Sequence, residues 1–122
     1  MSRRMICIAT LLVGCLAQAW AQNYPSKPIK VIVPYAAGGA ADITARVLGQ
    51  KMSESMGVPV LVDNKPGANG MIGTDFVAKS APDGYTLLLD ASGPLVVNPS
   101  LYAKVPYDTL KDLIPISQAT TF

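Results

Sequence analysis

The sequence contains no histidine, and both of its cysteines, Cys7 and Cys15, lie within the first 21 residues. In residues 22–122 these absences exclude a Ser-His-Asp triad, a Cys-His pair, a disulfide and any metal site built on His or Cys. There is no Walker A motif, and the spacing Gly67-x-x-Gly70-x-x-Gly73 differs from the dinucleotide-binding fingerprint. Acidic residues occur singly, without the spacing of a two-carboxylate catalyst. The sequence therefore predicts a protein that is not an enzyme.

The first 21 residues have the pattern of a secretory signal peptide. Basic Arg3-Arg4 precedes the apolar run Met5–Ala17, and the small-x-small sequence Ala19-Trp20-Ala21 is typical of a cleavage site. A buried N-terminal helix is the alternative. Leu12–Cys15 also resembles a lipobox, which would make Cys15 a lipid anchor. Cleavage after Ala21 is favoured over the lipobox, because the lipobox would leave a short leader. Cleavage after Ala21 and lipidation at Cys15 both predict export.

Residues 22–122 carry no net charge. Of the ten Lys and Arg, Arg3 and Arg4 belong to the leader, so eight basic residues balance eight acidic ones. This balance gives no indication of a nucleic acid or of an anionic membrane surface as a partner. No run of eighteen apolar residues follows the leader, so no membrane span is expected there. The length suits one small domain with a core.

Alternation of apolar, β-branched runs with helical patterns predicts an α/β fold, with right-handed βαβ units and a parallel sheet. Expected strands cover Ile29–Val33, Val58–Val62 and Tyr85–Asp90, and Leu113–Gln118 is expected to start a fourth. Expected helices cover Ala41–Met56 and Met71–Ser80, with a short helical turn near Pro99–Tyr102. The first helix is expected to carry one apolar stripe, formed by Ile43, Val47, Leu48, Met52 and Met56.

The best candidate site is the loop between the first strand and the first helix. Gly38-Gly39 leaves its backbone bare, and the first N–H groups of the following helix, with the positive end of its dipole, favour an anion. The alternative is a plain strand–helix turn. Ligands of parallel sheets gather at the carboxyl ends of the strands, where the loops Tyr35–Ala41, Asp63–Gly70 and Ala91–Pro94 are expected to meet.

Two acidic or amide side chains near these loops suit a role in capping a helix. Asp42 is interpreted as a cap or first-turn acid, and Asn69 as the N-cap of the second helix, rather than as ligand contacts. Arg46 is expected to be solvated or paired.

Three other residues have two interpretations each. Tyr35 either closes over a ligand or packs at the edge of the loop. Ser92 and Gly93 either form a turn or supply a hydroxyl and an N–H group to a carboxylate.

Five blocks, in order, resemble one family. They are YPSKPIKVIVPYAAGGAADITAR (Tyr24–Arg46), VDNKPGANGMIG (Val62–Gly73), AKSAPDGYTLL (Ala78–Leu88), NPSLY (Asn98–Tyr102) and PYD (Pro106–Asp108). This pattern is similar to the Bug family of periplasmic solute receptors, the binding components of tripartite tricarboxylate transporters. The resemblance covers essentially all of residues 22–122.

The resemblance implies the first lobe of a two-lobed, type II periplasmic-binding-protein fold that captures small carboxylates. It implies a periplasmic protein that works without a cofactor or catalysis, as a monomer, with the membrane subunits of a tripartite transporter. One ligand carboxylate would be held largely by backbone N–H groups and water. Carried over to this chain, the ligand-binding positions are Tyr35, Ala36, Ala37, Gly38, Gly39, Ala40, Ser92 and Gly93.

Two departures from the family bear on this hypothesis. Many members carry Thr or Ser where this chain has Ala41, so a hydroxyl contact or a helix cap is lost there. Members are also roughly three times as long, since their fold needs two domains. We therefore expect a truncated chain, holding part of the first lobe in residues 22–122, that binds weakly or not at all alone. The alternatives are a fragment without function and a small α/β enzyme or nucleotide binder that uses the Gly-Gly loop.

Overall fold

The structure is a computed structural model that describes residues 24–121. The predicted signal peptide, residues 1–21, and the alternative lipid anchor at Cys15 lie outside the described residues. No helix within residues 24–121 is both long and apolar enough to cross a membrane.

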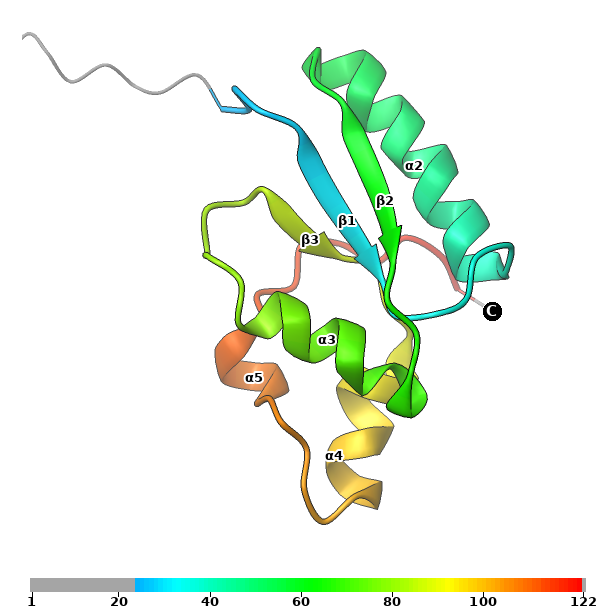
Figure 1. The fold of residues 1–122 in the computed structure, drawn as a ribbon, viewed down its shortest axis with the longest axis vertical. Coiled ribbons are helices and arrows are strands. Elements are labelled where there is room, and N and C mark those ends of the chain that lie inside the picture. Colours follow the sequence, from blue (N-terminus) through cyan, green and yellow to red (C-terminus); the bar gives the residue numbers. More distant parts are fainter. Residues whose placement is uncertain (1–23, 122) are drawn as a thin grey trace, which may run out of the picture.

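A three-stranded parallel sheet forms the upper part of the molecule (Figure 1). The strands β1 (Ile29–Val33), β2 (Val60–Asn64) and β3 (Thr86–Leu88) lie in the order β2-β1-β3. The central strand β1 is buried except at Lys30, because it has a neighbour on each side and helices nearby. The predicted α/β class with a parallel sheet is confirmed.

Two strands differ from the predicted bounds. β2 begins at Val60 rather than Val58, because Val60 pairs with Ile29, and Asn64 with Val33, at the end of β1. β3 is limited to Thr86–Leu88, although Tyr85 and Leu89 still form backbone hydrogen bonds with β1. Asp63 and Asn64 thus belong to β2 and lie at its carboxyl end.

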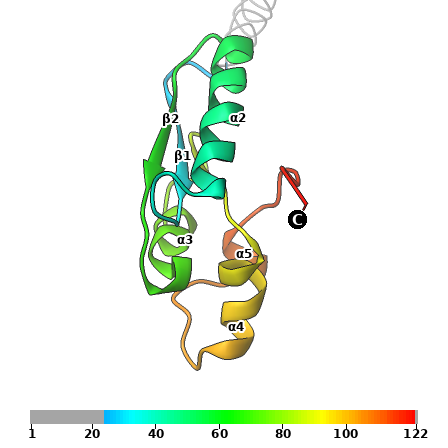
Figure 2. The ribbon, with the colours of Figure 1, turned by 90° about the vertical axis from the view of Figure 1, so that its right-hand side faces the viewer.

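The long helix α2 (Ala40–Met56) runs along one side of the sheet (Figure 2). The predicted apolar stripe does not form its buried face: Ile43 and Val47 are 56% and 58% exposed. The buried residues are instead Asp42, Ala45 and Gly49. The cause is a close approach, since a Cβ atom at Gly49 would lie 3.3 Å from Val60 Cγ1. A large side chain on this face would push α2 away from β2.

The remaining helices lie beyond the carboxyl ends of the strands (Figure 1). A 3₁₀ turn, η2 (Ala68–Gly70), leads into α3 (Met71–Ala78), which ends two residues before the predicted Ser80. The predicted turn near Pro99–Tyr102 is part of a longer helical stretch, η3 (Gly93–Val97) followed by α4 (Asn98–Leu101). The short helix α5 (Thr109–Asp112) was not predicted, although its N-cap, Asp108, accepts hydrogen bonds from two of its N–H groups.

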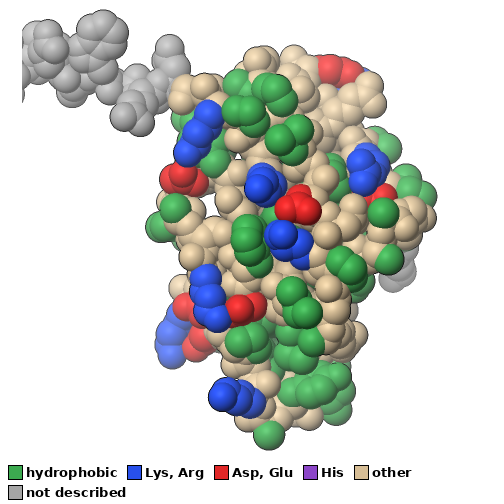
Figure 3. Space-filling model, viewed as in Figure 1, with side chains coloured by type: hydrophobic (Ala, Val, Ile, Leu, Met, Phe, Trp, Pro, Cys, Tyr) green, Lys and Arg blue, Asp and Glu red, His purple; other side chains and the backbone are tan. Residues whose placement is uncertain are grey.

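The segment Leu113–Gln118 forms no strand in the described part of the chain, contrary to the prediction. Its side chains Ile114 and Ile116 are 87% and 79% exposed. Figure 3 shows further hydrophobic groups on one face of the molecule, among small clusters of charged side chains of both signs. A good part of the apolar surface of residues 24–121 therefore remains in contact with solvent.

Candidate functional site

Side chains join the three loops at the carboxyl end of the sheet. Asn64 Nδ2 donates to the backbone oxygen of Tyr35 at 3.1 Å, which links the carboxyl end of β2 to the loop after β1. Tyr35 Oη donates to Asp90 Oδ1 at 2.9 Å, which links the loop after β1 to the end of β3. The loops thus meet at one edge of the sheet, as the parallel topology predicts.

The loop after β1 presents a bare backbone to solvent. The predicted binding positions from Ala36 to Ala40 are all exposed. Gly38 has φ +86°, a conformation that favours glycine, whereas Gly39 has φ −79°, which any residue adopts. A Cβ atom at Gly39 would have Ala36 O, 3.6 Å away, as its nearest neighbour, so nothing within residues 24–121 requires glycine at this position.

The N-terminus of α2 has free N–H groups beside this loop. Its N-cap, Gly39, supplies no side-chain hydrogen bond, and the N–H group of Ile43 donates to Gly39 O at 3.0 Å. Within the described residues, the N–H groups of Ala40 and Ala41 have no hydrogen-bond partner. They carry the positive end of the dipole of a seventeen-residue helix.

An ion pair between a buried carboxylate, Asp42, and a half-exposed Arg46 holds the loop from behind. Asp42 is 3% exposed, and its Oδ2 accepts hydrogen bonds from Gly38 N–H at 2.8 Å and from Arg46 Nε at 3.0 Å. The Arg46 guanidinium, followed by the Gly38 N–H, lowers the pKa of Asp42 to about 2. Arg46 also reaches Asn64 Oδ1, at 3.2 Å. Asp42 is confirmed as a first-turn acid and Arg46 as a paired cation, and the Gly38 N–H is already used within the protein.

A second polar cluster surrounds Asp90, at the end of β3. Its Oδ1 accepts from Tyr35 Oη and from Ala91 N–H, and its Oδ2 lies 2.8 Å from Thr74 Oγ1. Burial raises the pKa of Asp90, an effect that these hydrogen bonds partly offset. Burial, followed by the bond to Asp90, raises the pKa of Tyr35 to about 12. Tyr35 therefore packs at the edge of the loop in this structure, with its hydroxyl directed to Asp90.

The loop after β2 is fixed by an amide pair. Asn69 Nδ2 donates to Asn98 Oδ1 at 2.8 Å, and Asn98 Nδ2 donates to Asn69 O at 3.0 Å. The prediction that Asn69 caps α3 is wrong, because the N-cap is Gly70 and Asn69 is turned to the buried Asn98 of α4. Nearby, Tyr107 Oη donates to Pro94 O at 2.7 Å and joins η3 to the segment that precedes α5.

Ser92 and Gly93 begin a helical stretch after Asp90 rather than a tight turn. Ser92 is exposed, has helical φ and ψ, and forms no side-chain cap to η3. A Cβ atom at Gly93 would meet no atom within 4 Å. Both residues adjoin the Asp90 cluster and lie at the same edge of the sheet as the loop after β1, as predicted. Their role in binding stays a prediction.

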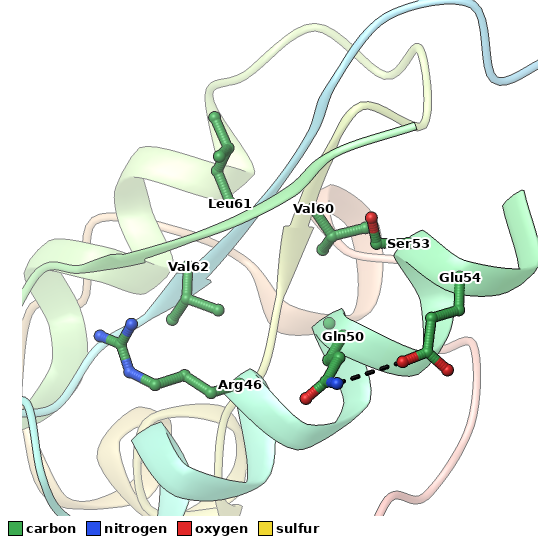
Figure 4. A pocket seen from close by; sticks show the side chains of 8 residues that line it. Arg46, Gln50, Ser53, Glu54, Val60, Leu61 and Val62 are labelled. Carbon is green, nitrogen blue, oxygen red and sulfur yellow. Dashed lines mark hydrogen bonds between the residues drawn. The ribbon is translucent and has the colours of Figure 1, made fainter. Parts of the chain in front are cut away.

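A separate groove lies between α2 and the free edge of β2, away from these loops (Figure 4). It has a volume of 540 Å³ and is lined by Arg46, Gly49, Gln50, Ser53, Glu54, Val60, Leu61 and Val62. Gln50 and Glu54 hydrogen bond to each other along its helical side. None of the predicted binding residues lines this groove.

The chemistry at the sheet edge suits recognition of an anion. It offers backbone N–H groups, a hydroxyl and a helix N-terminus. Residues 24–121 contain no group of three His, Cys, Asp or Glu side chains that could hold a metal ion. The structural comparisons identify the class of protein to which this fold and site belong, the periplasmic binding proteins. BugD, a periplasmic binding protein, superimposes with a TM-score of 0.66 at 40% identity, over 73% of this chain and 29% of its own.

The chain belongs to the tripartite tricarboxylate transporter receptor family. The profile described as "Tripartite tricarboxylate transporter family receptor" (TctC) matches residues 44–122. BugT of Bordetella pertussis is 51% identical over 113 residues, which are 92% of this chain and 34% of that protein. The chain thus spans about a third of the length of the curated relatives that it matches. The resemblance to the Bug family is confirmed, and members of this family are solute-binding receptors of the periplasm.

Two similar structures contain a named ligand. MatC from Rhodopseudomonas palustris, with bound malate, has a TM-score of 0.70 at 35% identity, over 73% of this chain and 30% of its own. A second R. palustris protein, with adipate, has a TM-score of 0.69 at 32% identity, over 71% of this chain and 29% of its own. Both of these ligands are small dicarboxylates.

Sequence reasoning missed the side chains that hold the loops together. The sequence placed Asn64 in the loop after the second strand and Asp90 at the end of the third, and it assigned no role to Thr74 or Asn98. The available signal was the position of Asn64 and Asp90, since polar side chains at the carboxyl ends of parallel strands meet at one edge.

Proposed function

We propose that this chain supplies one wall of the carboxylate-binding cleft of a periplasmic solute receptor, which serves the membrane subunits of a tripartite tricarboxylate-type transporter. The observation that carries the proposal is the exposed loop after β1, where the N–H groups of Ala40 and Ala41 have no partner at the start of α2. Such groups favour a carboxylate, through hydrogen bonds and the helix dipole. The malate and adipate of two similar proteins support this ligand class.

The proposed wall combines two loops. The positions from Tyr35 to Ala40 provide the backbone around the anion, and Ser92 with Gly93 provides a hydroxyl and an N–H group from the end of β3. The Gly38 N–H already donates to Asp42, so we assign the direct contacts with the ligand carboxylate to the N–H groups that follow Gly38. Binding then depends on space above the loop and not on a charged side chain.

The substitution Gly39→Val tests this assignment. The backbone at Gly39 is extended and a Cβ atom there contacts nothing closer than 3.6 Å, so valine fits the protein itself. It would occupy the space of the ligand. In a titration of the chain with malate, followed by amide NMR, we expect the signals of residues 36–41 and 92–93 to shift in the wild type and to stay unchanged in Gly39→Val.

The matched control is Ser55→Val, which adds the same side chain at an exposed position near the other end of α2. This variant should respond to malate as the wild type does. A Gly39→Val variant with the wild-type response would remove the loop after β1 from the site. Even weak binding by one wall of the cleft shifts amide signals at a high malate concentration. Shifts confined to other residues, or no shifts at all in the wild type under these conditions, would therefore contradict the proposed function.

A further inference from the structure

The carboxylate of Asp90 connects both loops of the proposed site with the helix between them in sequence. Its Oδ1 accepts from Tyr35 Oη at 2.9 Å, on the loop after β1, and from Ala91 N–H at 2.7 Å, on the loop after β3. Its Oδ2 lies 2.8 Å from Thr74 Oγ1 of α3. One side chain therefore joins three elements that are up to 55 residues apart in sequence.

The groups around Asp90 are held firmly and are uncharged. Thr74 is fully buried, and Tyr35 packs against the core cluster that contains Val31 and Val33. All three donors are neutral: a phenol, a hydroxyl and a backbone amide. A polar cluster whose members are all satisfied fixes one arrangement of its neighbours.

An asparagine can reproduce these contacts. Its Oδ1 would accept from Tyr35 and Ala91, and its Nδ2 would donate to Thr74 Oγ1. The Thr74 hydroxyl, which lies 3.0 Å from Gly70 O, would then donate there. An alanine at the same position would remove every contact. The chain thus allows geometry and charge to be separated at one position.

We propose that Asp90 is a positioning residue of the carboxylate site: through Tyr35 and Ala91 it sets the loops after β1 and β3 in one relative orientation, and it does so by hydrogen-bond geometry rather than by its charge. This inference rests on the proposed function. Asp90 acts through its two partners and does not touch the ligand. Loss of the Asp90 hydrogen bonds would let the N–H groups of the loops after β1 and β3 move independently, which weakens binding of an anion that both loops contact.

The first test needs no ligand. Amide hydrogen exchange of the full chain is compared among the wild type, Asp90→Ala, Asp90→Asn and Tyr35→Phe. We expect Asp90→Ala to speed exchange about tenfold at the hydrogen-bonded amides of the two loops, Gly38 and Ala91, because the local opening free energy falls. Asp90→Asn should exchange like the wild type, and Tyr35→Phe should speed exchange at Gly38 alone.

The matched control is Asp83→Asn, since Asp83 also accepts one backbone and one side-chain hydrogen bond but lies in the turn before β3. It should leave both loops unchanged. Wild-type exchange in Asp90→Ala, or exchange as fast in Asp90→Asn as in Asp90→Ala, would overturn the proposal. If Asp90→Ala does not fold, Tyr35→Phe decides the question, because unchanged exchange at the hydrogen-bonded Gly38 amide would overturn the proposal.

The second test uses malate as the probe. We expect Asp90→Asn to bind malate as the wild type does and Asp90→Ala to bind about tenfold more weakly. Equal weakening in both variants would make the charge, or a ligand contact, responsible and would overturn the positioning role. A wild type that binds no malate would reject the proposed function, while hydrogen exchange would still decide whether Asp90 sets the two loops.

Discussion

The carboxyl end of the sheet and the outer face of α2 differ in what they bury. At the sheet edge, polar Asp42, Thr74 and Asn98 are buried with partners, and backbones approach closely. On the outer face of α2, the large apolar side chains Ile43 and Val47 are exposed. Burial in residues 24–121 therefore follows how closely the backbones approach, and hydropathy alone does not predict it. The contrast also indicates where substitutions should matter.

The largest effect is expected at Gly70, where η2 and α3 meet the loop after β3. Gly70 has φ +83°, and a Cβ atom there would lie 2.4 Å from Pro94 Cγ. Gly70→Ala combines backbone strain with overpacking, so we expect a loss of about 3 kcal/mol in the free energy of unfolding, measured in urea.

The control for this prediction is Gly57→Ala. Gly57 also has a positive φ, +71°, but no atom lies within 4 Å of a Cβ placed there. Its loss should be limited to backbone strain, about 1 kcal/mol. Equal losses in the two variants would mean that the close approach to Pro94 contributes nothing.

A smaller effect on stability compares the buried sheet with the outer face of α2 more directly. Val33, fully buried in β1, and Val47, 58% exposed on α2, are both changed to alanine. Val33→Ala should lower the free energy of unfolding by about 2 kcal/mol, through lost burial and a cavity. Val47→Ala should raise it by about 0.5 kcal/mol, since alanine favours the helix.

Denaturation in urea at several protein concentrations checks both values. A loss at Val47 as large as that at Val33 would show that the outer face of α2 is buried in solution. The comparison between the two faces would then no longer hold.

The sequence predicted the parts of the fold that local patterns determine. The bounds of β1, the start of α3 and the order of elements up to β3 follow from apolar runs and turn residues close by. The predicted start of β2 was wrong, because it depends on which residue pairs with Ile29 of β1. The helical stripe was wrong, because it depends on how closely α2 approaches β2 at Gly49. That distance arises from packing between elements and has no signature in the sequence of either.

The candidate site shows the same division. The exposed loop after β1 was predicted, since a glycine pair between a strand and a helix is a local feature. Asn64 and Asp90 were missed as braces, because their partners at Tyr35 lie 29 and 55 residues away in sequence. Topology predicts which loops meet but not which side chains join them.

The smallest effect concerns pH and sets two carboxylates of the sheet edge against each other. The pKa of Asp42 is lowered to about 2, so its stabilising contribution is present above about pH 4 and is lost as the pH falls towards 2. The pKa of Asp90 is raised by burial, so the folded state holds its proton more tightly than the unfolded chain. Ionisation of Asp90 therefore costs stability as the pH rises above about 4.

Relative to Asp42→Asn, the wild type should lose stability on acidification, and relative to Asp90→Asn it should lose stability as the pH rises through the Asp90 pKa. Urea unfolding of the three proteins from pH 2 to 7 measures both slopes. Slopes of the same sign would contradict the contrast between a carboxylate held by a cation and one held by neutral donors.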